Sequence, residues 1–307
     1  MNKFRRYYDE LIFMNGISSL YTARLNYDKY KSLYEADFKV FSQYGEDGIL
    51  DFLLTKLKIY KPSFLEIGTQ NYRESNTRFI YQRTNCSGKI IDCDLNLSSK
   101  VKNALGSYLW KGDLEIISEF ITLENLFDTL KIKNEKDIID NDIFSLDIDG
   151  NDYWIMEKLI NKINSKIIVL EYNPYFGGSK SVTVPYDPNF DRTIYHYSNL
   201  CWGCSLKALF LLLDNNNYIF IGSNLNNSNG FWIRSDLLDQ INIKPPSINS
   251  LDEFTNCFAR ESRDKDNKLS YISGESRLKE IENCDLIDLE SKSKAPEKIK
   301  KIFNKYQ

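Results

Sequence analysis

One stretch constrains the fold more than any other: a short apolar run, 143–146, that passes directly into an acidic segment with Asp147, Asp149 and Asp152. An apolar run of this length, followed by a turn, is typical of a buried strand in a parallel sheet. In an open α/β sheet, ligands bind just beyond the carboxyl ends of such strands. The sequence therefore predicts a sheet with a polar crevice at the end of this strand.

The three carboxylates at 147, 149 and 152 indicate a functional cluster. Carboxylates that meet in a crevice repel one another and are costly to desolvate, so they need a cation, donors from a substrate, or water. The alternative is that Asp152 only caps the helix that follows it, while Gly150 makes the turn. Because one cap accounts for only one carboxylate, the functional cluster is the favoured interpretation.

Strand-like and helix-like patterns alternate through the middle of the chain, which implies right-handed crossovers and a parallel sheet. The runs 218–221 and 230–234 are joined by a short Asn- and Ser-rich turn, so they are expected to be antiparallel neighbours. The expected fold class is thus α/β, a Rossmann-like doubly wound sheet that is mostly parallel and has an antiparallel terminal hairpin. The strands expected before the hairpin are 63–67, 89–94, 114–121, 143–146 and 166–171, and the expected helices include 49–57, 74–83, 123–130 and 205–214.

Composition divides the chain into three parts. Residues 1–40 are rich in Tyr, Leu and Arg, and two helices are expected there, either covering the core or forming an interface between copies of the chain. The α/β domain is expected over 41–240. The C-terminal extension, 241–307, becomes polar, with an amphipathic helix expected over 295–306.

The 307 residues include 40 basic and 43 acidic side chains, a balance that leaves no electrostatic footprint for nucleic acid. No apolar run approaches the roughly 20 residues of a membrane span, and no signal-peptide core follows the N-terminus. A cytoplasmic protein with reduced cysteines is therefore expected. Of its six cysteines only Cys201 and Cys204 are closely spaced, and a redox role for them is the alternative to a structural one.

A long segment without regular structure is predicted between Gly177 and Cys204. It contains a Gly-Gly pair, two prolines, several aromatic residues and the single histidine, His196. Segments of this length inside a compact domain are usually lids or binding loops. His196 is a candidate general base because a neutral imidazole near pH 7 can accept a hydroxyl proton, and an ordinary loop histidine is the alternative.

Three motifs resemble those of a known family: Ser42-Gln43-Tyr44-Gly45-Glu46-Asp47, Asp147-Ile148-Asp149-Gly150-Asn151-Asp152-Tyr153-Trp154, and Val184-Pro185-Tyr186-Asp187-Pro188. Together with the expected fold, they resemble class I S-adenosylmethionine-dependent methyltransferases, and within that class the FkbM-type group. The resemblance covers roughly residues 41–236. It implies S-adenosylmethionine as the cofactor and O-methylation of a sugar, glycan or secondary-metabolite hydroxyl.

The resemblance assigns cofactor binding to residues at the ends of the first strands. A glycine in the first turn lets the backbone approach a ligand, and an acid that ends the second strand accepts the ribose hydroxyls. Gly68 and Asp94 match these roles, with Asp92 as the competing acid because strand ends are predicted only to within a few residues. The first turn departs from the family in having a single glycine. The residues expected to hold the cofactor are Gln43, Tyr44, Glu66, Gly68, Asn71, Asp94, Phe120 and Asp147.

Acids after the fourth and fifth strands are implied to hold a metal ion. The region of Asp149 and Glu171 is similar to magnesium-dependent sugar O-methyltransferases of macrolide pathways, in which acids at these positions bind the metal. Carboxylate oxygens suit Mg²⁺, and the expected ligands are Asp149, Asp152 and Glu171. The expected catalytic residues, which position the acceptor hydroxyl or remove its proton, are Asp147, Asp149 and His196.

Two other functions are considered. A dinucleotide-dependent oxidoreductase is expected to carry Gly-x-Gly-x-x-Gly, which this sequence lacks, and the terminal hairpin fits it poorly. A non-catalytic, methyltransferase-like binding protein is compatible with the single-glycine turn and with the added N- and C-terminal segments. Binding of S-adenosylmethionine distinguishes the cofactor-dependent enzyme from these alternatives.

Overall fold

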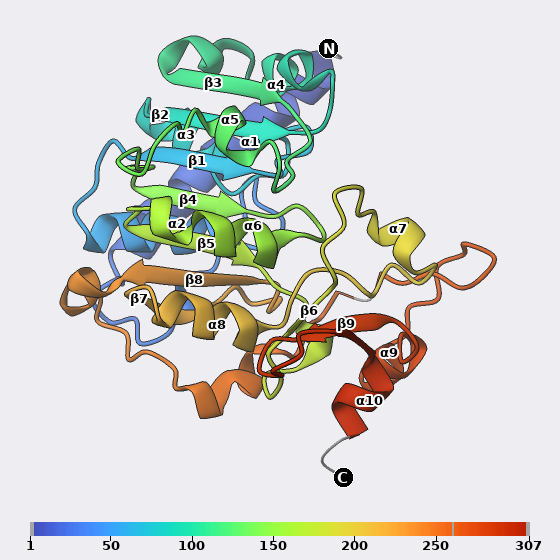
Figure 1. The fold of residues 1–307 in the computed structure, drawn as a ribbon. Helices are drawn as coiled ribbons and strands as arrows, with labels where there is room; N and C mark the ends of the chain where they lie inside the picture. Colours follow the sequence, from blue (N-terminus) through green and yellow to red (C-terminus); the bar gives the residue numbers. More distant parts are fainter. Residues whose placement is uncertain (1–2, 260, 305–307) are drawn as a thin grey trace.

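The chain folds around a seven-stranded sheet with the order β3-β2-β1-β4-β5-β8-β7 (Figure 1). The computed structural model describes residues 3–259 and 261–304. Strands β1 to β5 are parallel, and β8 runs antiparallel to both β5 and β7. This is the predicted Rossmann-like sheet with an antiparallel terminal hairpin. The strands are β1 (Ser63–Ile67), β2 (Ser87–Asp92), β3 (Asp113–Ser118), β4 (Ile143–Leu146), β5 (Ile167–Glu171), β7 (Tyr218–Ser223) and β8 (Asn229–Arg234).

Two strands end earlier than the sequence predicts. β1 ends at Ile67, which pairs with Ile91, so β2 has almost no neighbour on that side beyond this point. β2 accordingly ends at Asp92 rather than at Asp94. β3 is an edge strand that pairs only with β2, and it ends at Ser118, the partner of Asp92. The loss of a pairing partner therefore sets both ends.

Helices cover both faces of the sheet because the central strands are apolar on both sides. Along β4, Phe144 and Leu146 join one hydrophobic cluster and Ile143 joins the other, as the alternation of a strand requires. The first cluster includes α5 (Leu126–Leu130), α6 (Asp152–Leu159) and α8 (Leu206–Asp214), and the second includes α2 (Glu46–Lys56), α3 (Arg78–Thr84) and α4 (Leu97–Leu105).

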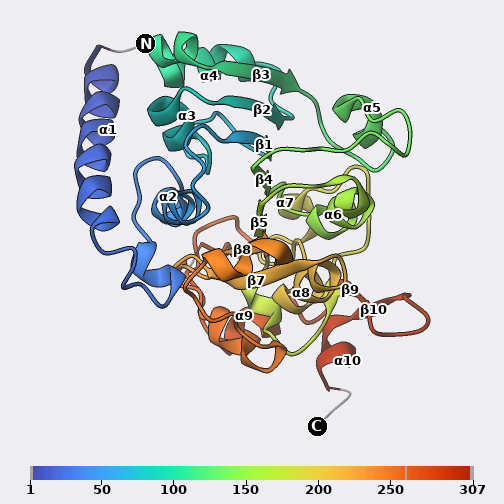
Figure 2. The ribbon, with the colours of Figure 1, turned by 90° about the vertical axis from the view of Figure 1, so that its left-hand side faces the viewer.

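The N-terminal segment forms one long helix, α1 (Lys3–Arg24), and a short 3-10 helix, η1 (Leu33–Ala36). In Figure 2, α1 runs along one side of the molecule, with α2 and α3 on its inner side. Phe13 packs against Phe79 with ring centroids 5.9 Å apart, and Asp9 pairs with Arg78 at 3.1 Å. The helix is thereby anchored to the domain through one face only.

The C-terminal segment contributes a second, smaller sheet in which β9 (Asp285–Asp288) lies between β6 (Val182–Thr183) and β10 (Pro296–Lys298). The helix expected over 295–306 begins at Ile299, after β10, and its expected last residues lie outside the described part of the chain. None of the described helices is both long and apolar enough to cross a membrane. The remaining helices are α7 (Arg192–Tyr195), α9 (Glu275–Glu280), α10 (Ile299–Asn304) and the 3-10 helices η2 (Gly106–Lys111), η3 (Ile160–Lys162), η4 (Pro174–Phe176), η5 (Ser235–Gln240) and η6 (Ile248–Phe254).

Candidate functional site

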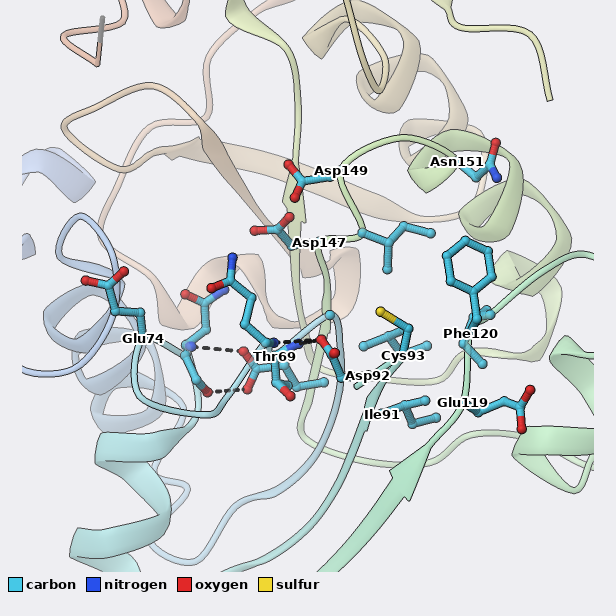
Figure 3. A pocket seen from close by; sticks show the side chains of 18 of the residues that line it. Thr69, Glu74, Ile91, Asp92, Cys93, Glu119, Phe120, Asp147, Asp149 and Asn151 are labelled. Atoms are coloured by element: carbon cyan, nitrogen blue, oxygen red, sulfur yellow. Dashed lines mark hydrogen bonds between the residues drawn. The ribbon is translucent and has the colours of Figure 1, made fainter. Parts of the chain in front are cut away.

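A cavity opens at the carboxyl ends of β1 to β4, where the strand order reverses on either side of the β1–β4 pair (Figure 3). Open α/β sheets bind their ligands at such a switch point. Its described lining contains six carboxylate side chains and no Lys, Arg or His. Figure 3 shows Asp147 and Asp149 close together, away from Glu119 and Phe120. The lining residues are Gln43, 66–70, 74–76, 91–93, 119–121, 147–149, Asn151, Phe190 and Asn229.

Gly68 joins the ends of β1 and β4 beneath this cavity. Its backbone has a φ of +86°, and a Cβ atom there would lie 1.5 Å from the carbonyl oxygen of Asp147. The Gly68 N–H donates to the carbonyl of Ile91 at 2.9 Å. The glycine is therefore required by a close approach of the chain to itself, at the floor of the cavity.

Asp92, rather than Asp94, is the acid of β2 that lines the cavity. Its Oδ2 accepts the N–H groups of Thr69 and Gln70 at 2.9 and 2.6 Å, and its Oδ1 accepts that of Asp94 at 3.0 Å. Asp94 itself pairs with Lys100, whose hydrogen bond lowers the pKa of the Asp94 carboxyl. Asp92 thus shapes the first turn while facing the cavity, because β2 ends two residues earlier than the sequence predicts.

Glu66 lines the cavity and also organises the loop before α3. Its carboxylate accepts the hydroxyl of Ser75 at 2.8 Å, the N–H groups of Asn76 and Thr77 at 2.9 and 3.2 Å, and the Thr77 hydroxyl. Burial raises the pKa of Glu66. Its carboxylate is thus largely engaged by the chain, so its direct capacity for a ligand is small.

The acids of the Ser42–Asp47 motif are structural. One oxygen of Asp47 accepts three backbone N–H groups, those of residues 40–42, each at 2.7 Å. Glu46 accepts the side-chain amides of Asn224 and Asn229 at 2.6 and 2.7 Å. The motif therefore ties the start of α2 to the hairpin of β7 and β8, and Asn229 extends that link into the cavity lining.

The remaining cofactor candidates divide into two groups. Gln43 and Phe120 line the cavity, whereas Tyr44 and Asn71 are outside its described lining. Burial raises the pKa of Tyr44 to about 12. The Asn71 side chain accepts the N–H of Arg73 at 3.0 Å, so it stabilises its own turn.

Asp147, Asp149 and Glu171 form an acidic cluster in which one carboxylate oxygen of each lies within 4.8 Å of the others. Leu146 and Leu170 are register partners on β4 and β5, so the residues that follow them, Asp147 and Glu171, emerge side by side. These two carboxyl groups hydrogen-bond to each other. Burial, followed by repulsion among the acids, raises the pKa of both carboxyl groups well above its usual range.

Asp152 does not belong to this cluster. Its Oδ1 accepts the N–H of Ile148 and its Oδ2 that of Gly150, both at 2.8 Å. Burial raises the pKa of Asp152 to about 6. Both carboxylate oxygens therefore stabilise the turn before α6, which is close to the capping role considered for this residue in the sequence.

The loop between Gly177 and Cys204 covers the cluster. Arg192 forms an ion pair with Asp149 and lies 5.8 Å from the ring centroid of Trp202. Phe190 packs on Gly150, where a Cβ atom would lie 2.2 Å from the ring. Only glycine leaves room for this contact, so the motif and the loop are matched in shape.

His196 is not brought to the cavity lining that the structure describes. Its Nδ1 lies 2.7 Å from the hydroxyl of Ser198, and its ring lies 4.3 Å from that of Tyr197, centroid to centroid. Burial lowers the pKa of His196. These contacts are those of a neutral loop histidine.

Four buried side-chain oxygens around the site have no hydrogen-bond partner in the described part of the chain. Those of Asn151, Glu171 and Asn229 act as acceptors, and the fourth is the hydroxyl of Thr69. Buried polar atoms without partners are costly, so such atoms indicate a ligand that donates hydrogen bonds. Sequence reasoning did not single out Thr69, Asn151 or Asn229. Asn151 belongs to the motif at 147–154, whereas no sequence pattern marks Thr69 or Asn229.

No protein-family model matches the chain, and no curated protein matches it. Similar solved structures include the pyocyanin biosynthetic protein PhzM, with 13% identity over 59% of this chain and a TM-score of 0.35. Coclaurine N-methyltransferase bound to N-methylheliamine and SAH has 13% identity over 68% of this chain and a TM-score of 0.35. The O-methyltransferase from Bacillus cereus in complex with SAH has 14% identity over 59% of this chain and a TM-score of 0.37. The matches span 53%, 65% and 77% of those three chains, and TM-scores of this size support no conclusion about activity.

Proposed function

We propose that the chain is an S-adenosylmethionine-dependent methyltransferase that acts on a hydroxyl group. The observation that carries this proposal is the cavity, whose described lining has six carboxylates and no cationic side chain. S-adenosylmethionine brings a positive sulfonium, a positive ammonium group and two ribose hydroxyls that donate hydrogen bonds. Its charge and donors match the acids and the unpartnered acceptors around the cavity.

The same lining argues against a dinucleotide. A pyrophosphate group binds where backbone N–H groups at a helix N-terminus or cationic side chains meet it. Here the N–H groups of Thr69 and Gln70 already donate to Asp92. Glu66 and Glu74 lie nearby in the lining and would repel a phosphate.

The residues that would hold the cofactor are Thr69, Asp92, Phe120 and Asp147. Oδ2 of Asp92 accepts two backbone N–H groups, but Oδ1 accepts only one and keeps a second lone pair for a ribose hydroxyl. The bound cofactor supplies an activated methyl group and a good leaving group.

The acidic cluster supplies the base in this proposal. Oε2 of Glu171 is buried and has no partner in the described residues. Burial and repulsion among the acids raise the pKa values of Asp147 and Glu171, which makes a carboxylate of this pair a stronger proton acceptor. As the methyl–oxygen bond formed, the O–H bond of the acceptor would break and its proton would pass to the carboxylate of Asp147, the member of the pair that lines the cavity, with Glu171 sharing that proton through their hydrogen bond.

A divalent cation is the alternative to a carboxylate base at this cluster, because carboxylates that hold an ion do not also accept the proton. Three carboxylate oxygens within 4.8 Å are hard donors of the kind that Mg²⁺ prefers, and the residues that would hold it are Asp147, Asp149 and Glu171. Held there, the ion would orient the acceptor hydroxyl and lower its pKa. Asp152 would support the turn instead of binding the ion, because both its oxygens accept backbone N–H groups.

The proposed acceptor is a polyhydroxylated small molecule or saccharide. Asn151 and Asn229 each present an unpartnered amide oxygen, and Phe190, which packs on Gly150, also lines the cavity. Amide oxygens accept hydroxyl donors, and a flat ring packs on the apolar face of a sugar. We therefore expect methyl transfer to sugar, glycan or secondary-metabolite hydroxyl groups.

Calorimetry with S-adenosylmethionine tests the cofactor. We expect Asp92→Ala to weaken binding by ~1.5–3 kcal/mol, the range for a lost charged partner. Asp94→Ala is the matched control, because its side chain points to Lys100, and it should leave the affinity unchanged.

Release of S-adenosylhomocysteine in the presence of a panel of sugars and glycans tests the transfer. No cofactor binding by the wild-type chain would rule the proposal out. Cofactor binding with no transfer to any hydroxyl compound would instead favour the non-catalytic binding protein.

A further inference from the structure

The outward face of α1 carries a row of large apolar side chains that no described element covers. Tyr7, Leu11, Met14, Tyr21 and Leu25 are 64%, 44%, 64%, 67% and 82% exposed. These positions follow the spacing of one helical face and its continuation past Arg24. We call this row the outward α1 face.

A surface helix that packs on a domain is normally polar on its far side. The inner side of α1 is already apolar, with Phe13 and Leu20 buried against the domain. The helix is therefore apolar on both sides, which is the pattern of a helix that is covered on both sides.

The charged residues of α1 favour a protein partner over a membrane surface. Interfacial helices carry Lys and Arg on their polar face to meet lipid headgroups. The basic residues at 3, 5 and 6 are confined to the first turn of α1. From Tyr7 to Leu25, where the outward α1 face lies, the charged residues are Asp9, Glu10 and Arg24, and Arg24 is bound to Asp51 at 2.7 Å. Tyr and Met are instead enriched in the buried centres of protein interfaces.

The size of the face suits a dimer. An aromatic side chain covers about 150–250 Å² when it is buried. At the exposures given, the five residues of the outward α1 face offer on the order of 500–700 Å². A standard interface buries roughly 800 Å² per partner.

The outward α1 face can pair with a second copy of itself in the antiparallel direction, with Gly16 at the centre of the pair. In an antiparallel pair of α1 helices centred there, Tyr7 faces Leu25 of the second copy and Leu11 faces its Tyr21. Met14 faces Ser18, a small residue that leaves room for the longer side chain. Every residue of the outward α1 face thus meets an apolar or small partner, as a two-fold interface requires.

We infer that the chain forms a homodimer through the outward α1 face, with the two α1 helices antiparallel. This inference is independent of the proposed function, because it rests on residues outside the cavity lining. The occupant is a second copy of the same chain.

Sedimentation velocity of the full chain tests the inference with a pair of double variants. In Leu11→Glu with Tyr21→Glu, carboxylates face each other across the two-fold axis, and we expect a monomer. In Leu11→Glu with Tyr21→Lys, each Glu faces a Lys of the second copy, and we expect the dimer to persist in low salt. Tyr60→Glu, at a site that is 79% exposed and outside α1, should leave the dimer intact.

Circular dichroism of each variant confirms that the helix is retained. A wild-type chain that is monomeric across the micromolar range overturns the inference. Equal dissociation of both double variants overturns the antiparallel pairing. Binding of a monomeric wild-type chain to vesicles of phosphatidylcholine and phosphatidylserine would assign the face to a membrane instead.

Discussion

At the scale of single residues, the junction of β1 and β4 leaves the least room for change. Gly68 combines a φ of +86° with a neighbouring carbonyl oxygen that would lie 1.5 Å from any Cβ atom. Gly106 has a φ of +55° with no atom within 4 Å of that position. The two glycines therefore separate the cost of backbone conformation from the cost of a clash.

We expect Gly68→Ala to lower the free energy of unfolding by about 3 kcal/mol or more, since strain and overpacking add. Gly106→Ala should cost about 1–3 kcal/mol, the conformational part alone, because φ +55° with ψ −125° is a conformation that only glycine adopts readily. Urea denaturation of both variants measures the difference. Equal losses would show that Asp147 can move away at little cost.

The hydrogen-bonded pair of Asp147 and Glu171 leads to a prediction about pH. Because the folded-state pKa of Glu171 is raised, its contribution to stability is present below the unfolded-state pKa and is lost as pH rises toward the folded-state value. Glu171→Gln does not titrate. We therefore expect this variant to melt a few degrees higher than wild type at pH 7–8, with the gain vanishing toward pH 4, and to lose methyl transfer.

Glu115→Gln is the control with the opposite sign. Hydrogen bonds from Lys131 and Lys89 lower the pKa of Glu115, so its contribution is present at neutral pH and is lost as pH falls. This variant should be slightly less stable than wild type at pH 7. Melting curves of both variants and of wild type from pH 4 to 8 measure these differences in stability. If Glu171→Gln were no more stable than wild type at any pH, the raised pKa of Glu171 would be contradicted.

At the scale of elements, the loop between Gly177 and Cys204 closes the acidic end of the cavity. It reaches the site through Arg192, 43 residues beyond Asp149 along the chain, and through Phe190. The guanidinium balances part of the negative charge of the cluster. A metal ion in the cluster would compete with Arg192 for Asp149.

If the cluster binds a divalent cation, Arg192→Ala should tighten that binding, because the competing positive charge is removed. A hydrogen bond between charged groups contributes about 1.5–3 kcal/mol, so a gain of roughly tenfold or more is expected. Calorimetry with Mg²⁺ and Mn²⁺ measures it. Arg234→Ala, which breaks the pair of Arg234 with Asp236 outside the cavity, is the control. If neither variant nor the wild-type chain binds Mg²⁺ or Mn²⁺, the proposed metal site is ruled out.

At the scale of the whole molecule, the C-terminal segment supports the loop that covers the site. Val182 and Thr183 of β6 pair with Asp288 and Ile287 of β9, and Leu286 is fully buried in the cluster that includes Val184 and Leu200. Residues more than 100 positions apart therefore share one small core. The loop can hold its shape only while β9 is in place.

We expect Leu286→Ala to destabilise the chain by about 2–5 kcal/mol, the range for a large-to-small change in a core. Leu269→Ala, at a site that is 44% exposed, should change stability by less than about 0.5 kcal/mol. Hydrogen exchange should show faster exchange in 182–204 for the first variant only. If hydrogen exchange in 182–204 were unchanged in Leu286→Ala, the stability of the loop would not depend on the C-terminal sheet.

The sequence by itself determined the sheet, its parallel direction, its terminal hairpin and the edge at which the polar residues gather. These features follow from local patterns: apolar runs of strand length, helical periodicity between them, and a turn too short for a crossover. The acids at 147 and 149 could be placed at that edge because they directly follow an apolar run.

Only the tertiary structure decided which of these residues meet. Asp92 and Asp94 are two positions apart in the sequence. Which of them faces the cavity depends on where the pairing between β1 and β2 stops. Asp147 reaches Glu171 through strand register, and Arg192 reaches Asp149 through the path of a long loop. Such contacts join distant parts of the chain and depend on packing of the whole domain, so no local pattern in the sequence encodes them.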